Sequence, residues 1–326
     1  MSGRLWVSVL ASAVVVLGGL AAQGQSWPTR PLTLVVPFAA GGPSDVAGRI
    51  IAQRLGEVLG QQVVVDNPSG AGGTVGSTRV SKAPPDGYQF VIGNIGTHAW
   101  SQSLYRKLPY DTLADFTPLG LVVESPRTLI VPRTFPADTL PDFIAHVRAK
   151  QASMQFASAG AGSASHMSCI LLNAALGVSV THVPYRGLGP AMQDLIAGRI
   201  DYMCDSPSTS AQPIESNLVK AIATTGDRRW ATLPAIPTAK EQGLDFEVMT
   251  WQALFLPKGT PDQIVRRLEQ AVSETLDTPS VREHFRAVGE DVISPDRRGS
   301  AYLARFVAAE IAKWSGPIKA SGVTTD

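Results

Sequence analysis

Apolar and polar positions follow a recurring order along this chain: a short apolar run, a loop of small residues, then a stretch with helical spacing. Residues 32–36 form a continuous run of β-favouring residues, as in strands buried on both faces of a sheet. Apolar residues then recur at helical spacing over residues 46–59, and Gly60 marks a helix end. Strands that alternate with helices predict an α/β fold of parallel sheets with helices on both faces.

The same order continues to the end of the chain. Thr139, followed three residues later by Asp142, is typical of a helix N-terminus, and Gly177 is placed like a helix end. Further strands are predicted at residues 62–65, 88–92, 154–157, 180–183 and 200–203, and further helices near residues 262–276 and 301–313.

Glycine and small polar residues collect directly after the apolar strands and before the helices. In open α/β sheets this is the edge where ligands bind. Glycine lets the backbone approach a ligand, and helix N-termini present free N–H groups and partial positive charge. Several such termini converging from two lobes would form an anion site that needs few charged side chains.

Motifs for catalysis are missing from these loops. The chain has no G-x-S-x-G nucleophile elbow, no phosphate-binding G-x-x-x-x-G-K-[ST] and no G-x-G-x-x-G, and its five histidines lack close metal-ligand spacing. His98, His166 and His182 lie at loop edges, where a hydrogen-bonded structural imidazole is as compatible as a ligand contact. We therefore expect no enzyme, no catalytic residues, no metal and no cofactor.

Length and charge narrow the class further. The 326 residues suffice for two lobes or one large domain. The net charge is only +1 and no basic run occurs, so nucleic-acid binding is not expected.

The N-terminus is typical of a secretory signal. Arg4 precedes an apolar run over residues 5–20, which is followed by small residues, and the run is short for a membrane span. We expect cleavage between Ala22 and Ser26, which gives a signal peptide of about residues 1–25 and a soluble exported protein.

Only two cysteines are present, Cys169 and Cys204. In an exported protein they could form a disulfide. The alternative is a pair of small buried residues in one core, and both interpretations stay open.

The loops carry a specific resemblance. Residues 37–45 (PFAAGGPSD) resemble the P-[FY]-x-x-G-G-x-[TS]-D signature of the Bug-type binding proteins of tripartite tricarboxylate transporters. Supporting blocks follow in order through the mature chain at residues 66–73 (DNPSGAGG), 85–88 (PDGY), 96–98 (GTH), 182–187 (HVPYRG), 233–238 (LPAIPT) and 253–261 (ALFLPKGTP).

The resemblance implies a two-lobed periplasmic binding protein type II fold, with a ligand cleft between lobes that are joined by two crossing strands. Lobe 1 would comprise residues 26–123 and 228–326, and lobe 2 residues 124–227. It implies a periplasmic monomer that captures a small carboxylate by cleft closure and delivers it to membrane permease subunits. A sensor that reports the ligand to a receptor is the alternative, and a secreted hydrolase is a third class.

The family's carboxylate contacts, backbone amides and small hydroxyls, can be transferred to matching positions of this chain. Asp45 could instead cap its helix, Asp205 could be structural, and Arg186 could be a solvated rim residue. The remainder of the ligand would contact variable side chains such as Trp100, Ser206 and Trp251, which leaves aromatic and aliphatic carboxylates open. The expected ligand-binding residues are Phe38, Ala39, Gly42, Ser44, Asp45, Gly72, Gly73, Thr97, His98, Ser158, Gly162, Ser163, Ser165, Tyr185, Arg186 and Asp205.

Overall fold

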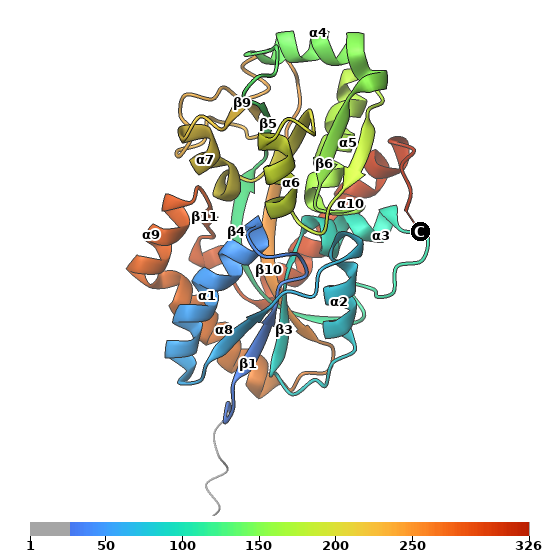
Figure 1. The fold of residues 1–326 in the computed structure, drawn as a ribbon. Coiled ribbons are helices and arrows are strands. Elements are labelled where there is room, and N and C mark those ends of the chain that lie inside the picture. Colours follow the sequence, from blue (N-terminus) through green and yellow to red (C-terminus); the bar gives the residue numbers. More distant parts are fainter. Residues whose placement is uncertain (1–26, 326) are drawn as a thin grey trace, which may run out of the picture.

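Two β-sheets organise the chain into two lobes, stacked one above the other (Figure 1). The structure, a computed structural model, describes residues 27–325, so the expected signal peptide lies outside the described residues. Within that part, no helix is long and apolar enough to cross a membrane.

The first lobe is built on a six-stranded sheet with the order β11-β4-β10-β3-β1-β2. β1 is parallel to β2 and β3, whereas β10 is antiparallel to β3 and β4, and β11 is antiparallel to β4. The strands are β1 (Leu32–Val35), β2 (Val63–Asp66), β3 (Gln89–Asn94), β4 (Phe116–Pro126), β10 (Met249–Pro257) and β11 (Asp291–Val292).

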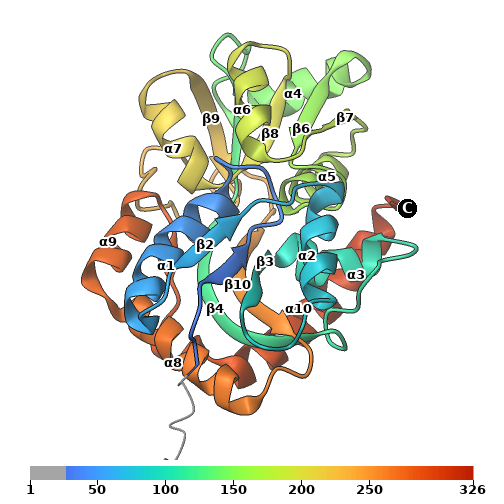
Figure 2. The ribbon, with the colours of Figure 1, turned by 60° about the horizontal axis from the view of Figure 1, so that its bottom comes forward.

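Helices cover both faces of this sheet, as the alternation along β1 requires (Figure 2). Leu32 and Leu34 belong to a core with α1, α8 and α9, whereas Val35 faces the other way, into a core with α2 and α10. These helices and the short turns of the lobe are α1 (Pro43–Leu59), η1 (Ala71–Gly73), α2 (Thr74–Ser81), η2 (Gly96–Trp100), α3 (Ser101–Leu104), α8 (Asp262–Asp277), α9 (Pro279–Ala287), η4 (Pro295–Arg297) and α10 (Ser300–Ala320).

The second lobe has a five-stranded sheet with the order β7-β6-β8-β5-β9. β6 is parallel to β7 and β8, and β5 is antiparallel to β8 and β9. The elements are β5 (Thr128–Pro132), α4 (Leu140–Lys150), η3 (Gln151–Ser153), β6 (Gln155–Ser158), α5 (Ala164–Leu176), β7 (Thr181–Pro184), α6 (Leu188–Ile196), β8 (Tyr202–Asp205), α7 (Pro207–Glu215) and β9 (Val219–Thr224).

The chain passes between the lobes twice. β4 of the first sheet leads through Arg127 into β5 of the second, and the return runs from β9 through residues 225–248 into β10. Because the outgoing and returning strands run in opposite directions, each sheet contains antiparallel pairs. The prediction of parallel sheets therefore holds for β1–β3 and for β6–β8 and is wrong for the pairs that involve β4, β5, β9, β10 and β11, while the α/β class and the two-lobed fold are confirmed.

Local helix signals in the sequence correspond to real ends. The Thr139 hydroxyl accepts a hydrogen bond from the Asp142 backbone N–H at 3.3 Å, so Thr139 caps α4. Gly60 and Gly177 end α1 and α5 with φ of 69° and 65°, the left-handed conformation that glycine adopts without steric cost.

Candidate ligand-binding site

A small cavity lies where the two lobes meet, and both lobes contribute to its wall. The first lobe provides the start of α1, the end of β3 and the start of β10, and the second provides the start of α5 and the residues after β6 and β8. The lining residues are Phe38, Gly42, Pro43, Ser44, Asn94, Ser125, Arg127, Ala159, Ser163, Ala164, Ser165, Leu188, Ser206, Thr250, Trp251, Gln252 and Glu290.

Two helices from opposite lobes begin at this cavity. α1 starts with Gly42 as its N-cap and Pro43 in its first turn, and no side chain caps it. α5 starts at Ser163, whose hydroxyl accepts from the His166 backbone N–H at 3.3 Å. Both N-termini add partial positive charge to the cavity, which favours an anion.

Arg127 adds a full positive charge to the cavity, beside the partial charges of the two helix N-termini. Its side chain lines the cavity and only 5% of the residue is exposed. Its backbone is fixed at the crossing between the lobes, because its N–H donates to the Thr225 hydroxyl and its carbonyl accepts from the Thr225 N–H, both at 2.8 Å. Among residues 27–325, none forms a hydrogen bond or ion pair with the guanidinium, and its Nε is buried without a partner.

Two acidic residues lie near this arginine without pairing with it. Glu290 lines the cavity, and its Oε1 accepts from the Ser206 hydroxyl at 2.7 Å. Asp205 accepts through Oδ1 from the Ser206 N–H and the Thr209 hydroxyl, while its Oδ2 has no partner in the described chain. Burial raises the pKa of Asp205 to about 6 and also raises the pKa of Glu290.

Five of the expected ligand-binding residues line the cavity. They are Phe38, Gly42, Ser44, Ser163 and Ser165, from the loops after β1 and β6 and the first turns of α1 and α5. Ser206 and Trp251, expected among the variable side chains, line it as well, whereas Trp100 is buried in the first lobe against Trp314.

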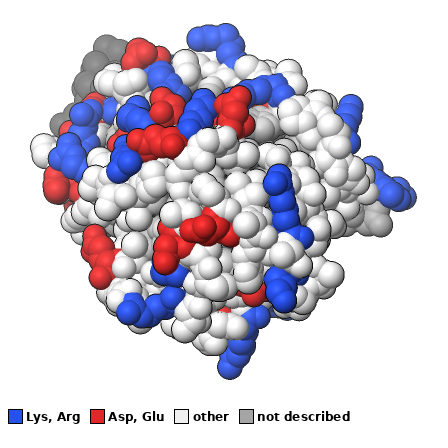
Figure 3. Space-filling model, turned by 90° about the horizontal axis from the view of Figure 1, so that it is seen from above, with Lys and Arg blue, Asp and Glu red and all other residues white. Residues whose placement is uncertain are grey.

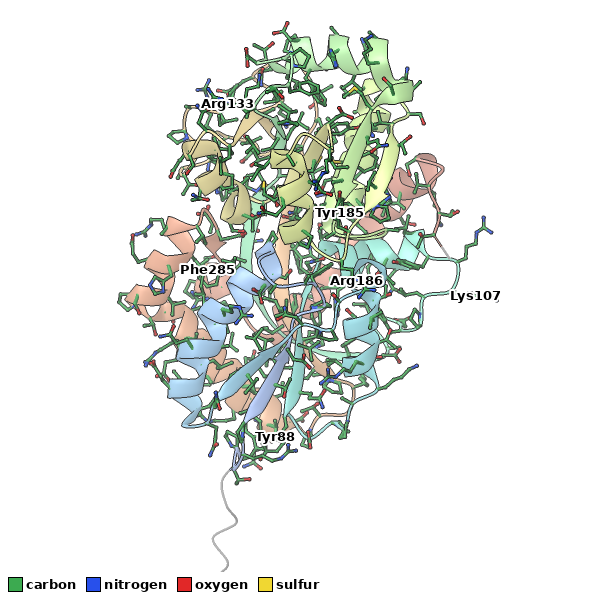
Figure 4. The ribbon with its side chains drawn as sticks, in the orientation of Figure 1. Tyr88, Lys107, Arg133, Tyr185, Arg186 and Phe285 are labelled. Carbon is green, nitrogen blue, oxygen red and sulfur yellow. The ribbon has the colours of Figure 1, made fainter. Side chains whose placement is uncertain are left out.

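Other expected residues lie at the contact between the lobes rather than along the cavity. The Ala39 N–H donates to the Arg186 carbonyl at 3.1 Å, while the Arg186 residue itself is exposed. Gly72 is packed against Ala161, and a Cβ on Gly162 would meet the Tyr105 ring. Gly73 packs against Thr97 and Phe38, and Figure 4 shows Tyr185 and Arg186 at the level where the lobes meet.

The remaining expected residues have internal partners. Thr97 bonds to Asn94, Ser158 to His182, and Tyr185 donates to Asp194 at 2.6 Å. The His98 ring is fully buried, stacks on Phe255 and lies 2.8 Å from the Thr97 hydroxyl, and burial lowers its pKa to about 3. Ligand contact by these side chains stays a prediction.

Asp45 is bound within the first lobe. Its carboxylate accepts from the Gly41 N–H, from Arg49 at 2.9 Å and from Asn67 at 3.1 Å. Burial alone would raise the pKa of Asp45, but these hydrogen bonds outweigh it and lower the pKa. The N-cap of α1 is Gly42, so Asp45 fixes the preceding loop instead of capping the helix.

Cys169 and Cys204 are free thiols in the structure, and the disulfide considered above is not formed. Both are buried in one core, where α5 packs on β8, and the two thiols interact. The alternative of two small core residues describes this arrangement.

Several cavity residues carry no motif in the sequence. Arg127, Glu290, Gln252, Asn94, Ser125 and Thr250 were not expected there. Arg127 leaves one trace, because it and Glu124 are the charged residues between two β-favouring runs. Glu290 follows a helix in a short irregular stretch and leaves none.

The charged side chains at the end of the molecule that carries α4 do not mark a second anion-binding site there. There, acidic and basic side chains are interspersed between broad uncharged areas, and no wide basic area covers that face (Figure 3). Among the described residues, no group of three or more His, Cys, Asp or Glu side chains is arranged to bind a metal ion.

Two lobes, two crossings and a cavity between them define the class of two-lobed solute-binding proteins. The family model described as "Tripartite tricarboxylate transporter family receptor" matches residues 47–323, and the chain belongs to this family.

Solved structures agree with this assignment. MatC from Rhodopseudomonas palustris, solved with bound malate, is 41% identical with a TM-score of 0.88, covering 90% of this chain and 100% of MatC. The periplasmic binding protein BugD is 38% identical with a TM-score of 0.89, covering 92% of this chain and 100% of BugD. An R. palustris protein solved with adipate is 35% identical with a TM-score of 0.86, covering 91% and 99%. The expected resemblance to Bug-type proteins is confirmed.

Proposed function

We propose that this protein captures a small aliphatic carboxylate between its lobes and delivers it to the membrane permease of a tripartite tricarboxylate transporter. Residues 26–123 and 228–326 would close on residues 124–227, and release would require the lobes to part. The protein would perform no chemistry on its ligand, in keeping with the solute-binding family to which it belongs.

The observation that carries this proposal is the unpaired guanidinium of Arg127. Removing an arginine from water is costly unless a counter-charge and hydrogen bonds replace the solvent. Arg127 is 5% exposed, and no described residue pairs with it. A ligand carboxylate in the cavity would provide the missing acceptors in the bidentate geometry that guanidinium groups favour.

Size and relatives support an aliphatic ligand. The cavity is closed in by Phe38, Leu188 and Trp251, which leaves little room for a large ring. The relatives solved with ligands contain malate and adipate, open-chain dicarboxylates of four and six carbons. We therefore place an aliphatic dicarboxylate ahead of a benzoate-like ligand.

A thermal-shift screen tests the proposal directly. The purified protein is heated with mono-, di- and tricarboxylates, aliphatic and aromatic, with sugars and neutral amino acids as controls. A ligand at 100 times its dissociation constant adds about 2.7 kcal/mol of stability, which is a shift of several degrees. A shift with aliphatic dicarboxylates supports the proposal, whereas a shift with sugars alone contradicts it.

A further inference from the structure

Opposite charges share the cavity without neutralising each other. Arg127 and Glu290 both line it, with exposed fractions of 5% and 3%, yet no ion pair or hydrogen bond joins them in the described chain. Glu290 is engaged by the Ser206 hydroxyl and Arg127 by no side chain. Charges this deeply buried normally pair, so their separation leaves room for a ligand that engages both.

Gln252 adds a second acceptor to the same wall. Its Nε2 donates to the Pro43 carbonyl at 3.5 Å. Because that carbonyl can only accept, the amide nitrogen must face it, and Oε1 is turned elsewhere. Oε1 is buried and has no hydrogen-bond partner among the described residues. An unpaired buried acceptor is costly, and a ligand donor would remove that cost.

We infer that the cavity selects carboxylates that also carry a hydrogen-bond donor, a hydroxyl or an ammonium group, and that Gln252 and Glu290 recognise this donor while Arg127 binds the carboxylate. The inference rests on the proposed function and specifies its ligand class. It follows from three side chains that line the cavity: the Arg127 guanidinium is a cationic donor without a partner, and Gln252 Oε1 and the Glu290 carboxylate are acceptors.

An unsubstituted dicarboxylate fits this wall less well. It would satisfy Arg127 but leave Gln252 Oε1 unpaired, and its second carboxylate would meet Glu290 and the nearby Asp205 in a site of low dielectric. A hydrogen-bond donor beside the carboxylate would pair with Gln252 Oε1. An ammonium group also offsets the acidic side chains, so hydroxyl and ammonium ligands respond differently to the charge of Glu290.

The test compares ligands that differ only at one carbon. Succinate, malate and aspartate share a four-carbon dicarboxylate skeleton and carry hydrogen, hydroxyl or ammonium at C2, and calorimetry measures the affinity of each. We expect malate, aspartate or both to bind at least about fivefold more tightly than succinate, because that factor corresponds to the smallest usual cost of an unpaired buried acceptor. If only six-carbon ligands bind, then adipate, 2-hydroxyadipate and 2-aminoadipate form the same series.

Two variants separate the roles of the two acceptors. Gln252→Leu removes the amide oxygen and is expected to abolish the advantage of malate and reduce that of aspartate, which keeps its contact with Glu290, while leaving the affinity for succinate within about threefold. Glu290→Gln keeps an acceptor but removes the charge, so it should weaken aspartate by about tenfold or more and change malate little. Glu283→Gln, at an exposed position of α9, is the matched control and should leave all three affinities unchanged.

These measurements distinguish failure of the inference from failure of the residue assignment and from failure of the proposed function. Equal affinity of all three ligands for the wild-type protein would overturn the inference while leaving carboxylate capture intact. An advantage that survives both Gln252→Leu and Glu290→Gln would overturn the assignment to these residues. Absence of any carboxylate-induced stabilisation would instead remove the proposed function itself. The melting temperature of each unliganded variant shows whether the lobes still fold.

Discussion

Arg127 has opposite effects on the stability of the unliganded protein and on its affinity for a carboxylate. Its guanidinium is buried without a partner, so in the unliganded protein it contributes a desolvation cost and little compensation. Such a residue is expected where a ligand supplies the counter-charge, because selection for folding alone would favour an apolar side chain of similar volume.

We therefore predict that Arg127→Met abolishes carboxylate binding without destabilising the unliganded protein. Affinity should fall at least about 100-fold, in the range seen when one partner of a buried charge pair is removed. The free energy of unfolding should stay constant or rise by about 1 kcal/mol or more. Calorimetry and urea denaturation measure the two quantities, and Arg133→Met, at an exposed position of the second lobe away from the cavity, is the control with a change of less than about threefold. Wild-type affinity in Arg127→Met would show that another group neutralises the ligand.

Single residues of the site were the least predictable part of the chain. Phe38, Gly42 and Ser163 were expected because the resemblance to Bug-type binding proteins transfers the family's carboxylate contacts to these positions, in loops of small residues that follow strands. Arg127 and Glu290 could not be predicted, since their role depends on burial and on which distant residues face them. Sequence periodicity records neither of these.

At the scale of elements, most strands and helices followed from local patterns, but their directions did not. β1 was expected at residues 32–36 and lies at Leu32–Val35, and α8 was expected at residues 262–276 and lies at Asp262–Asp277. The antiparallel pairing of β4 with β10 was missed, because neither strand was among those predicted and an apolar run reads the same in either direction. Only the path of the whole chain, out to the second lobe and back, sets that direction.

The start of η2 shows how closely elements of the two lobes approach. Gly96 belongs to the first lobe, and a Cβ on it would overlap the backbone nitrogen of Ala164 at the start of α5. That atom is in the second lobe, and no atom of the first lobe is among the nearest neighbours of the added Cβ. The absence of a side chain at Gly96 therefore permits this close approach of the two lobes.

We predict that Gly96→Ala lowers ligand affinity by about tenfold or more while leaving the unliganded melting temperature within about 3 °C, since the added methyl obstructs only the closed arrangement. Calorimetry and thermal denaturation report the two effects. Gly316→Ala, in α10 with open space around it, is the control and should leave affinity unchanged and stability slightly raised. Unaltered affinity in Gly96→Ala would mean that ligand binding does not require this lobe contact.

At the scale of the whole molecule, the two lobes meet through individual hydrogen bonds and through a side chain of one lobe that packs in the other. The Tyr105 hydroxyl lies 2.9 Å from the Ala161 carbonyl, and the Ala39 N–H reaches the Arg186 carbonyl. Phe38, from the first lobe, packs in the core of the second with Leu188 and Met192. Contacts of this kind can separate and re-form, which a binding protein needs when it releases its ligand.

Both lobes also contain histidines, buried at His98 and His166 and half-buried at His182, whose surroundings favour the neutral ring, which makes the whole fold sensitive to acid. Burial lowers the pKa of His98 and His166 to about 3 and that of His182 to about 4, below the usual value of 6.5. Below pH 6.5 the unfolded chain therefore binds protons that the folded chain does not, and stability falls as pH falls. The raised pKa of Asp205, about 6, acts in the opposite direction between pH 6 and 4, because there the folded state binds the extra proton.

With three histidines against chiefly one strongly shifted carboxyl group, we predict a net loss of stability between pH 6.5 and 4. Urea denaturation at constant ionic strength measures the slope of the unfolding free energy against pH. In His182→Gln the slope should decrease by about one proton, since the amide can still bond to the Ser158 hydroxyl, which lies 2.6 Å from His182 Nε2, but does not titrate. A slope equal to that of the wild-type protein would show that His182 is already protonated in the folded state, and that the acid sensitivity of the molecule has another source.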